Sequence, residues 1–129
     1  VARMFMTSLK ECVIIDSKGI VSASRKQTTC ETYGEFCHQV SGSNLQLQSL
    51  KTGKYLAINK NCRIYSTNDA NSKDTILTDV IANHNNYSIY IYKVITQKKC
   101  YLNVTSNAII QRCSFAPSPL KPELRGTCT

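Results

Sequence analysis

Apolar and polar residues alternate over short distances along this chain, as they do in β-strands with one buried face. Small polar clusters of Asp, Asn, Ser, Lys and Gly separate the apolar runs and suit hairpin turns. No segment carries the period of about 3.6 residues that marks an amphipathic helix. The pattern therefore predicts an all-β chain, with its clearest strands at residues 12–15, 45–50, 55–58 and 87–92.

One hairpin pattern occurs three times, in VIIDSKGIVSAS from Val13, LAINKNCRIYST from Leu56 and LNVTSNAIIQRC from Leu102. Each copy begins with an apolar residue, has a second two positions later and a third six positions beyond that. The offsets of 43 and 46 residues leave room for about four strands in each repeat, or about twelve in all. A single repeat cannot bury its own apolar face, so we expect three repeats around one core. The second positions, Ile15, Ile58 and Val104, should then be equivalent core sites.

The length of 129 residues predicts a single domain over 1–129. No apolar stretch approaches the roughly 18 to 20 residues of a membrane span, so we expect no membrane insertion. The N-terminus lacks the apolar segment of a signal peptide, and we interpret the chain as mature protein. From about residue 115 the prolines Pro117, Pro119 and Pro122 predict an irregular tail, because proline lacks the amide donor of a paired strand.

Seven cysteines, none in a CxxC spacing, indicate disulfides and an oxidising, extracellular location rather than a zinc site. The short separation of Cys30 and Cys37 predicts a bond between them, and the odd number leaves at least one cysteine unpaired within the chain. Two glycosylation sequons, at Asn86 and Asn103, agree with secretion.

The formal charge of +8 indicates a polyanionic partner, which for a secreted protein means a sulfated glycan rather than nucleic acid; solubility alone is the alternative. Catalysis is not expected, because the chain has two histidines, eight carboxylates and no recognisable nucleophile or paired-carboxylate motif. Cys37 and His38 are adjacent, but neighbouring residues of a strand point to opposite faces and the spaced partner ligands of a metal site are missing. We therefore predict no metal and no cofactor.

The second hairpin, GKYLAINKNCRIYST at 53–67, resembles a pattern of the fibroblast growth factor family. Residues 9–25 resemble the first hairpin of that family, including the turn glycine and an arginine on the next strand. Residues 84–90 (HNNYSIY) are similar to its Asn-Tyr-x-x-Tyr segment, and 98–104 (KKCYLNV) to its third-repeat strand. The resemblance covers most of residues 3–114 in register.

The resemblance implies a secreted β-trefoil that binds the immunoglobulin-like ectodomain of a receptor tyrosine kinase, with heparan sulfate as co-receptor. The positions that match the family's receptor-facing residues are Phe5, Arg25, Asn85, Asn86 and Tyr87. Large aromatic and arginine side chains of this kind often dominate the affinity of protein interfaces. For Tyr87, a buried aromatic between strands is the alternative interpretation.

The chain departs from the family where heparan sulfate usually binds, on the turn of the third hairpin. The family's basic positions there are Thr105, Ser106, Asn107 and Gln111, and only Lys121 remains basic. We therefore expect weaker or relocated heparan binding. The candidates are Lys93, Lys98, Lys99 and Lys121, with a second group at Lys51, Lys54, Lys60 and Arg63.

The altered C-terminus is a further departure, where a bond from Cys128 would hold the tail. Together with the lost basic turn, it leaves a second function open. The chain would then be a diverged trefoil of viral or parasite type, a modulator or antagonist that binds a receptor, a cytokine or a glycan without signalling. An interleukin-1-type cytokine ranks below both, since that group usually lacks the YLAINK-like hairpin.

Overall fold

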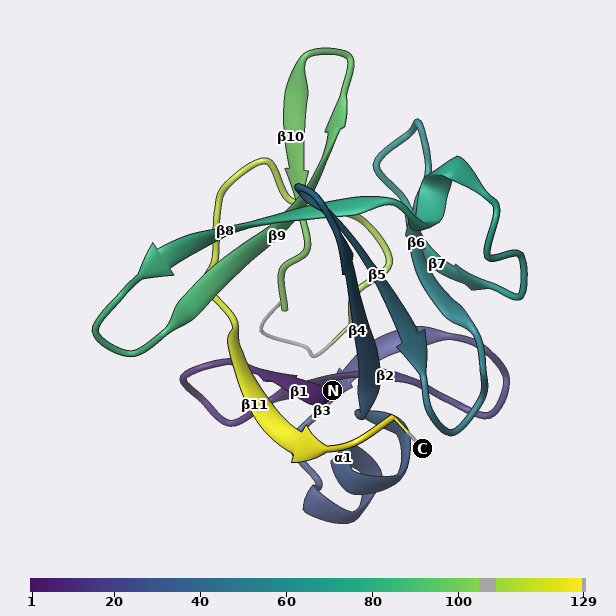
Figure 1. The fold of residues 1–129 in the computed structure, drawn as a ribbon, viewed down its shortest axis with the longest axis vertical. Helices are drawn as coiled ribbons and strands as arrows, with labels where there is room; N and C mark the ends of the chain where they lie inside the picture. Colours follow the sequence, from purple (N-terminus) through teal and green to yellow (C-terminus); the bar gives the residue numbers. More distant parts are fainter. Residues whose placement is uncertain (105–108, 129) are drawn as a thin grey trace.

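The computed structural model describes residues 1–104 and 109–128. In this part of the chain, eleven strands form one curled sheet, with one short α-helix and one 3-10 helix (Figure 1). The elements are β1 (Ala2–Met6), β2 (Cys12–Ile15), β3 (Val21–Ser24), α1 (Gln27–Tyr33), β4 (Phe36–Ser41), β5 (Asn44–Ser49), β6 (Tyr55–Ile58), β7 (Ile64–Thr67), η1 (Lys73–Thr75), β8 (Leu77–Asn83), β9 (Ser88–Ile95), β10 (Lys98–Tyr101) and β11 (Lys121–Gly126). The all-β prediction is confirmed.

Apolar residues of all three predicted repeats meet in one hydrophobic core, as a β-trefoil requires, and the first two repeats form paired hairpins in the described chain. In the first, β2 pairs with β3 and places Ile15 opposite Val21; in the second, β6 pairs with β7 and places Ile58 opposite Ile64. Ile15 and Ile58 are both fully buried, while Val104 packs against the same core but is partly exposed. The prediction of equivalent core sites therefore holds for Ile15 and Ile58, whereas Val104 is less deeply buried.

A helix that the sequence pattern did not predict lies between β3 and β4. α1 has seven residues and no side-chain cap at Lys26, so it is too short to be stable alone. Its Cys30 is buried against Met4, Cys12 and Ile14, and a disulfide joins Cys12 to Cys30. Tertiary packing and this bond hold the helix in place.

The predicted Cys30–Cys37 bond is wrong. Cys30 faces β2 from the helix and bonds to Cys12, whereas Cys37 lies on β4 opposite Ala2 and bonds to Cys128. The helix separates the two cysteines and turns their side chains toward different partners. Cys128 also accepts a hydrogen bond at 3.3 Å from the amino group of Val1, so the two ends of the chain lie together (Figure 1).

The tail from residue 115 is only partly irregular, which corrects the sequence prediction. Pro117 and Pro119 lie outside any strand, but β11 pairs with β1 over most of its length and Pro122 stands opposite Phe5. In the described chain β11 pairs with β1 alone, and such an edge strand tolerates a proline. The disulfide from Cys128 fixes the end of this strand.

A third disulfide joins Cys62, in the β6–β7 turn, to Cys100 on β10. Cys113 is the free cysteine among the described residues, as the odd count predicted. It is partly buried, and this burial raises the pKa of its thiol to about 12. No helix in the described chain has the length and apolar character to cross a membrane.

Candidate functional site

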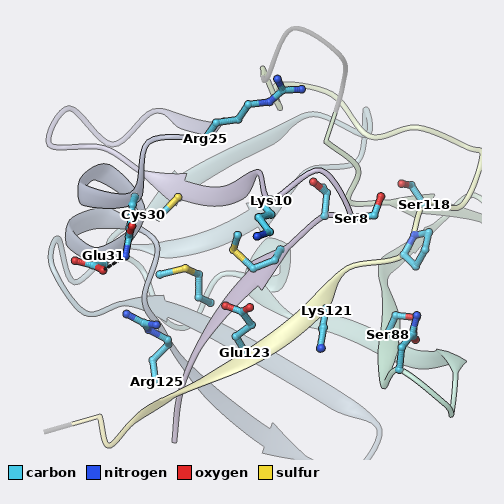
Figure 2. Close-up of a pocket in the computed structure, with 16 residues that line it drawn as sticks. Ser8, Lys10, Arg25, Cys30, Glu31, Ser88, Ser118, Lys121, Glu123 and Arg125 are labelled. Carbon is cyan, nitrogen blue, oxygen red and sulfur yellow. Dashed lines mark hydrogen bonds between the residues drawn. The ribbon is translucent and has the colours of Figure 1, made fainter.

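A groove of about 710 Å³ opens on the surface of the described chain (Figure 2). It lies between β1, the β1–β2 turn, α1, the β8–β9 turn and β11. Segments from both ends of the chain therefore form it together with the turn that contains Asn86. Its main side chains are Met4, Met6, Lys10, Arg25, Glu31, Asn86, Lys121, Glu123 and Arg125.

The apolar part of the groove comes from β1. Met4 and Met6 line it together with Cys30 of α1. They face this side because alternate residues of a strand point to the same face, which leaves Phe5 on the other. Methionine is flexible and polarizable, and it adapts to partners of different shape. The groove therefore has a floor suited to an apolar anchor from a protein partner.

Phe5 does not face a partner, which corrects its predicted role. Its side chain is 1 % exposed and its ring packs 6.1 Å from that of Phe36, measured between centroids. β1 pairs with β11 and β4 around this residue and closes the core over it. Its neighbours Met4 and Met6, one position away on each side, line the groove instead; Met4 is 4 % exposed, and Met6 is the more open of the two.

Arg25 lines the groove and makes an ion pair with a buried acid. Its Nε lies 3.7 Å from Oε2 of Glu11, whose side chain is 5 % exposed while that of Arg25 is 64 % exposed. The β1–β2 turn holds Glu11, because its backbone N–H donates to Thr7 Oγ1 at 3.1 Å and its carbonyl accepts from Thr7 N–H at 2.8 Å. The Arg25 guanidinium therefore contacts Glu11 through its Nε atom, while most of the side chain is open to solvent.

The opposite rim is β11. Lys121, Glu123 and Arg125 project from alternate positions of this strand toward the groove (Figure 2). Arg125 Nε donates to Glu35 Oε2 at 3.2 Å, which ties β11 to the segment after α1. The rim therefore carries both signs of charge, a pattern typical of the polar edge of a protein interface. Sequence reasoning missed Glu123 and Arg125 because it expected no strand here.

The β8–β9 turn brings Asn86 to the groove. Ser88 Oγ donates a hydrogen bond to Asn86 Oδ1 at 2.9 Å, and both residues line the groove. Asn85 and Tyr87 flank Asn86 and are exposed, but they are not part of the lining. Tyr87 has a left-handed φ of 47° and is 47 % exposed, so it is not the buried aromatic of the alternative interpretation. Of the predicted receptor-facing residues, the structure brings Arg25 and Asn86 together.

The predicted heparan residues do not form one site. Lys93 Nζ donates to the carbonyls of Lys73 at 2.7 Å and Ile76 at 3.0 Å, and desolvation lowers its pKa. Lys98 lies over the ring of Phe115, Lys99 over that of Tyr92, and Lys121 lines the first groove. The turn residues Thr105, Ser106 and Asn107 lie outside the described residues.

Asn103 does not fit the predicted glycosylation. It is 8 % exposed, and its Nδ2 donates to the carbonyl of Ala116 at 2.5 Å. An N-linked glycan would have to attach to this same Nδ2 atom. The backbone of Ala116, which accepts its hydrogen bond, occupies the space next to it. The exposed Asn86 has no such obstruction in the described chain.

Three repeats share one core, and the described residues of the first two form paired hairpins, as in a β-trefoil. The sequence model of one family, described as FGF, fibroblast growth factor, matches residues 1–116. The chain therefore belongs to the fibroblast growth factor family, whose members are growth factors without enzymatic activity and are generally secreted. A search of curated proteins finds none that matches this chain.

Proposed function

We propose that this protein is a secreted, growth-factor-like ligand that binds a receptor tyrosine kinase ectodomain of the fibroblast growth factor receptor type. Family membership supports the class of protein, and three disulfides support an oxidising, extracellular environment. One observation carries the proposal. Arg25 and Asn86, which are far apart in the sequence, line one groove above a floor of Met4 and Met6.

This groove has the chemistry of a protein-binding surface. A methionine floor offers apolar area, while Arg25 and Asn86 offer directional hydrogen bonds at its edge. Tyr87 extends the same turn outward as an exposed aromatic. Binding of heparan sulfate is the second part of the proposal, and we place it away from the family's third-hairpin turn because that turn has lost its basic residues.

Surface plasmon resonance against fibroblast growth factor receptor ectodomains, with and without heparin, tests the proposal. The groove variant Met6→Glu should weaken receptor binding at least tenfold, because it places a charge on the apolar floor. The variant Val40→Glu is a control, since Val40 is 65 % exposed and does not line the groove. Absence of binding to every receptor, by wild-type protein with native disulfides, would rule the proposed partner out.

Binding without signalling is the second candidate function. β11 supplies one rim of the groove, and it lies beyond residue 116, where the match to the family model ends. A rim outside the part of the chain that the family model matches favours an altered outcome of receptor binding. Receptor phosphorylation in responsive cells separates the two functions: an agonist raises it, whereas an antagonist binds and blocks the response to a second growth factor.

A further inference from the structure

Three cysteines from three separate segments of the chain meet at the hydrophobic core. Cys62 lies in the β6–β7 turn, Cys100 on β10 and Cys113 in the segment that follows residue 109. Cys100 belongs to the core cluster, and Cys62 and Cys113 both pack against it. A disulfide joins Cys62 to Cys100, and Cys113 is the free cysteine of the described chain. A thiol and a disulfide therefore share one cluster.

Cys113 stands directly opposite Cys62. An isolated antiparallel bridge pairs Arg63 with Arg112, and beside it the N–H of Cys113 donates to the carbonyl of Cys62 at 2.7 Å. Opposed residues of an antiparallel ladder have Cα atoms about 4.5 to 5.5 Å apart. A disulfide spans Cα separations of about 4.4 to 6.8 Å. Cys113 is therefore within disulfide reach of Cys62, as Cys100 is at 6.0 Å between Cα atoms.

The same segment pairs with β10 on its other side. Tyr101 and Ser114 exchange both backbone hydrogen bonds, at 2.9 and 3.1 Å. This register places Cys113 diagonally from Cys100, and diagonal neighbours of a ladder are about 7 to 8 Å apart. That separation exceeds the usual span of a disulfide. Cys62 therefore has two possible partners, whereas Cys113 has Cys62 as its nearer one.

A second groove, of about 360 Å³, opens between the β6–β7 turn and the β9–β10 hairpin. Cys62 and Cys113 line it, whereas Cys100 does not and is 0 % exposed. Lys98 and Arg112 line the same groove, and positive charge favours the thiolate form of an approaching thiol. A small thiol can therefore reach the Sγ atom of Cys62 from the groove, with Cys100 as the sulfur that leaves.

We propose that these three cysteines form a thiol–disulfide exchange site, at which Cys113 replaces Cys100 as the partner of Cys62. The thiolate of a small thiol attacks Sγ of Cys62, the Cys62–Cys100 bond breaks, and the departing Cys100 thiolate takes up a proton. The Cys113 thiol loses a proton, attacks Sγ of Cys62 and expels the small thiolate. One proton has then moved from Cys113 to Cys100, the small thiol is regenerated, and no oxidant or reductant is consumed.

The exchange changes which segments are tied together. The Cys62–Cys100 bond ties the second hairpin to β10, whereas a Cys62–Cys113 bond ties it to the segment that leads to β11. β10 then keeps its pairing with β9 and the bridge at Tyr101. Burial raises the pKa of Cys113 to about 12 and keeps this thiol protonated, so exchange is slow. The two disulfide forms are therefore separable states of the β9–β10 hairpin.

Incubation of the native protein with reduced and oxidised glutathione tests the proposal. Acid quenching, alkylation of free thiols in denaturant and non-reducing peptide mapping then identify the bonds. Before incubation the label should be on Cys113; afterwards a fraction of the chains should carry a Cys62–Cys113 bond and a label on Cys100. Absence of this bond at every glutathione ratio would overturn the proposal. Equal yields of bonds from Cys113 to the cysteines of the other two disulfides would mean general scrambling and would overturn it as well.

Two matched variants identify the shared partner. Cys100→Ala leaves Cys62 and Cys113, which are opposed and should form a disulfide in the redox buffer. Cys62→Ala leaves Cys100 and Cys113, which are diagonal and should join roughly tenfold more slowly or not at all. Equal rates in the two variants would contradict the role of Cys62. Peptide mapping of the wild-type protein stands on its own if either variant fails to fold.

Hydrogen exchange measures the effect on β10. The amides of Lys98–Tyr101 should exchange faster in oxidised Cys100→Ala than in Cys113→Ala, which keeps the Cys62–Cys100 bond. Cys62→Ala has neither bond and gives the unrestrained reference. The amides of β2, which lies in the first hairpin, are the internal control and should exchange alike in all three variants. Equal exchange of the β10 amides in Cys113→Ala and Cys62→Ala would show that the disulfide does not restrain β10 and would overturn the two-state hairpin.

Discussion

The Nε atom of Arg25 lies 3.7 Å from the Oε2 atom of Glu11, and the two residues differ sharply in exposure. Glu11 is buried beneath the β1–β2 turn, while most of the Arg25 side chain is open to a partner. Arg25 therefore serves the fold and the candidate groove at once. Loss of binding in an Arg25 variant has to be separated from loss of stability.

Arg25→Ala should lower the free energy of unfolding by about 1 to 2 kcal/mol, because the Glu11 carboxylate would lose its charged partner. Urea unfolding measures this change. Arg25→Lys keeps the charge and should recover part of the stability, but not the two-pronged geometry of a guanidinium. Unchanged stability in Arg25→Ala would show that Glu11 does not depend on the ion pair.

Tyr87→Ala should weaken receptor binding by roughly 2 kcal/mol, about thirtyfold, if the exposed ring is a central contact. Tyr87 has a positive φ, so Tyr87→Gly is a useful companion that removes the ring and relaxes the backbone. Equal losses in the two variants would assign the effect to the ring. Full binding by both would remove Tyr87 from the contact surface.

The two roles predicted for Asn86 exclude each other. Asn86 lines the first groove, so a glycan on its Nδ2 would stand where a receptor has to approach. Protein made in a secretory host should bind the receptor at least tenfold more weakly when Asn86 carries a glycan. Ser88→Ala removes the sequon but keeps Asn86, and should restore binding. Mass spectrometry should find Asn103 unmodified, since its nitrogen is occupied; a glycan there would refute this packing.

Removal of the Cys37–Cys128 bond should cost more stability than removal of Cys12–Cys30. The two bonds span 91 and 18 residues, and loop-closure entropy gives about 4 to 5 and about 3 kcal/mol respectively. Cys37→Ala/Cys128→Ala and Cys12→Ala/Cys30→Ala, compared by chemical denaturation, measure the difference. The first variant should also weaken receptor binding, because β11 forms a rim of the groove. The reverse order of stability would contradict the entropic argument.

Stability should fall in alkaline solution because of Cys113. Burial raises its pKa from 9.0 to about 12, so the fold favours the protonated thiol. The contribution is fully present below pH 9 and is lost as the pH rises toward 12. Thermal unfolding of Cys113→Ser between pH 7 and about 11 is the measurement, and its decline should be shallower than that of wild type. Parallel declines would mean that other groups account for the effect.

Pattern alone was sufficient for the fold class and for most of the core. The spacing of Val13, Ile15 and Val21 repeats at Leu56, Ile58 and Ile64, and these six residues are all buried in one cluster. Apolar periodicity is local, and a residue's position in a hairpin repeat fixes which face of the strand it occupies. The odd cysteine count likewise predicted at least one cysteine unpaired within the chain, though not which one.

The groove depended on contacts that no local pattern encodes. Phe5 and Met6 are adjacent apolar residues, and only the pairing of β1 with β4 and β11 decides which of them is buried. Cys30 and Cys37 are close in sequence, but the helix between β3 and β4 directs them to Cys12 and Cys128. β11 contains a proline and pairs with β1, while the Cys37–Cys128 disulfide ties its end to β4 and the Arg125–Glu35 ion pair ties it to the segment after α1. The sequence by itself determined the repeats and their core. The surface of the first groove was decided by pairing between strands far apart in the chain, which forms only when the whole sheet closes.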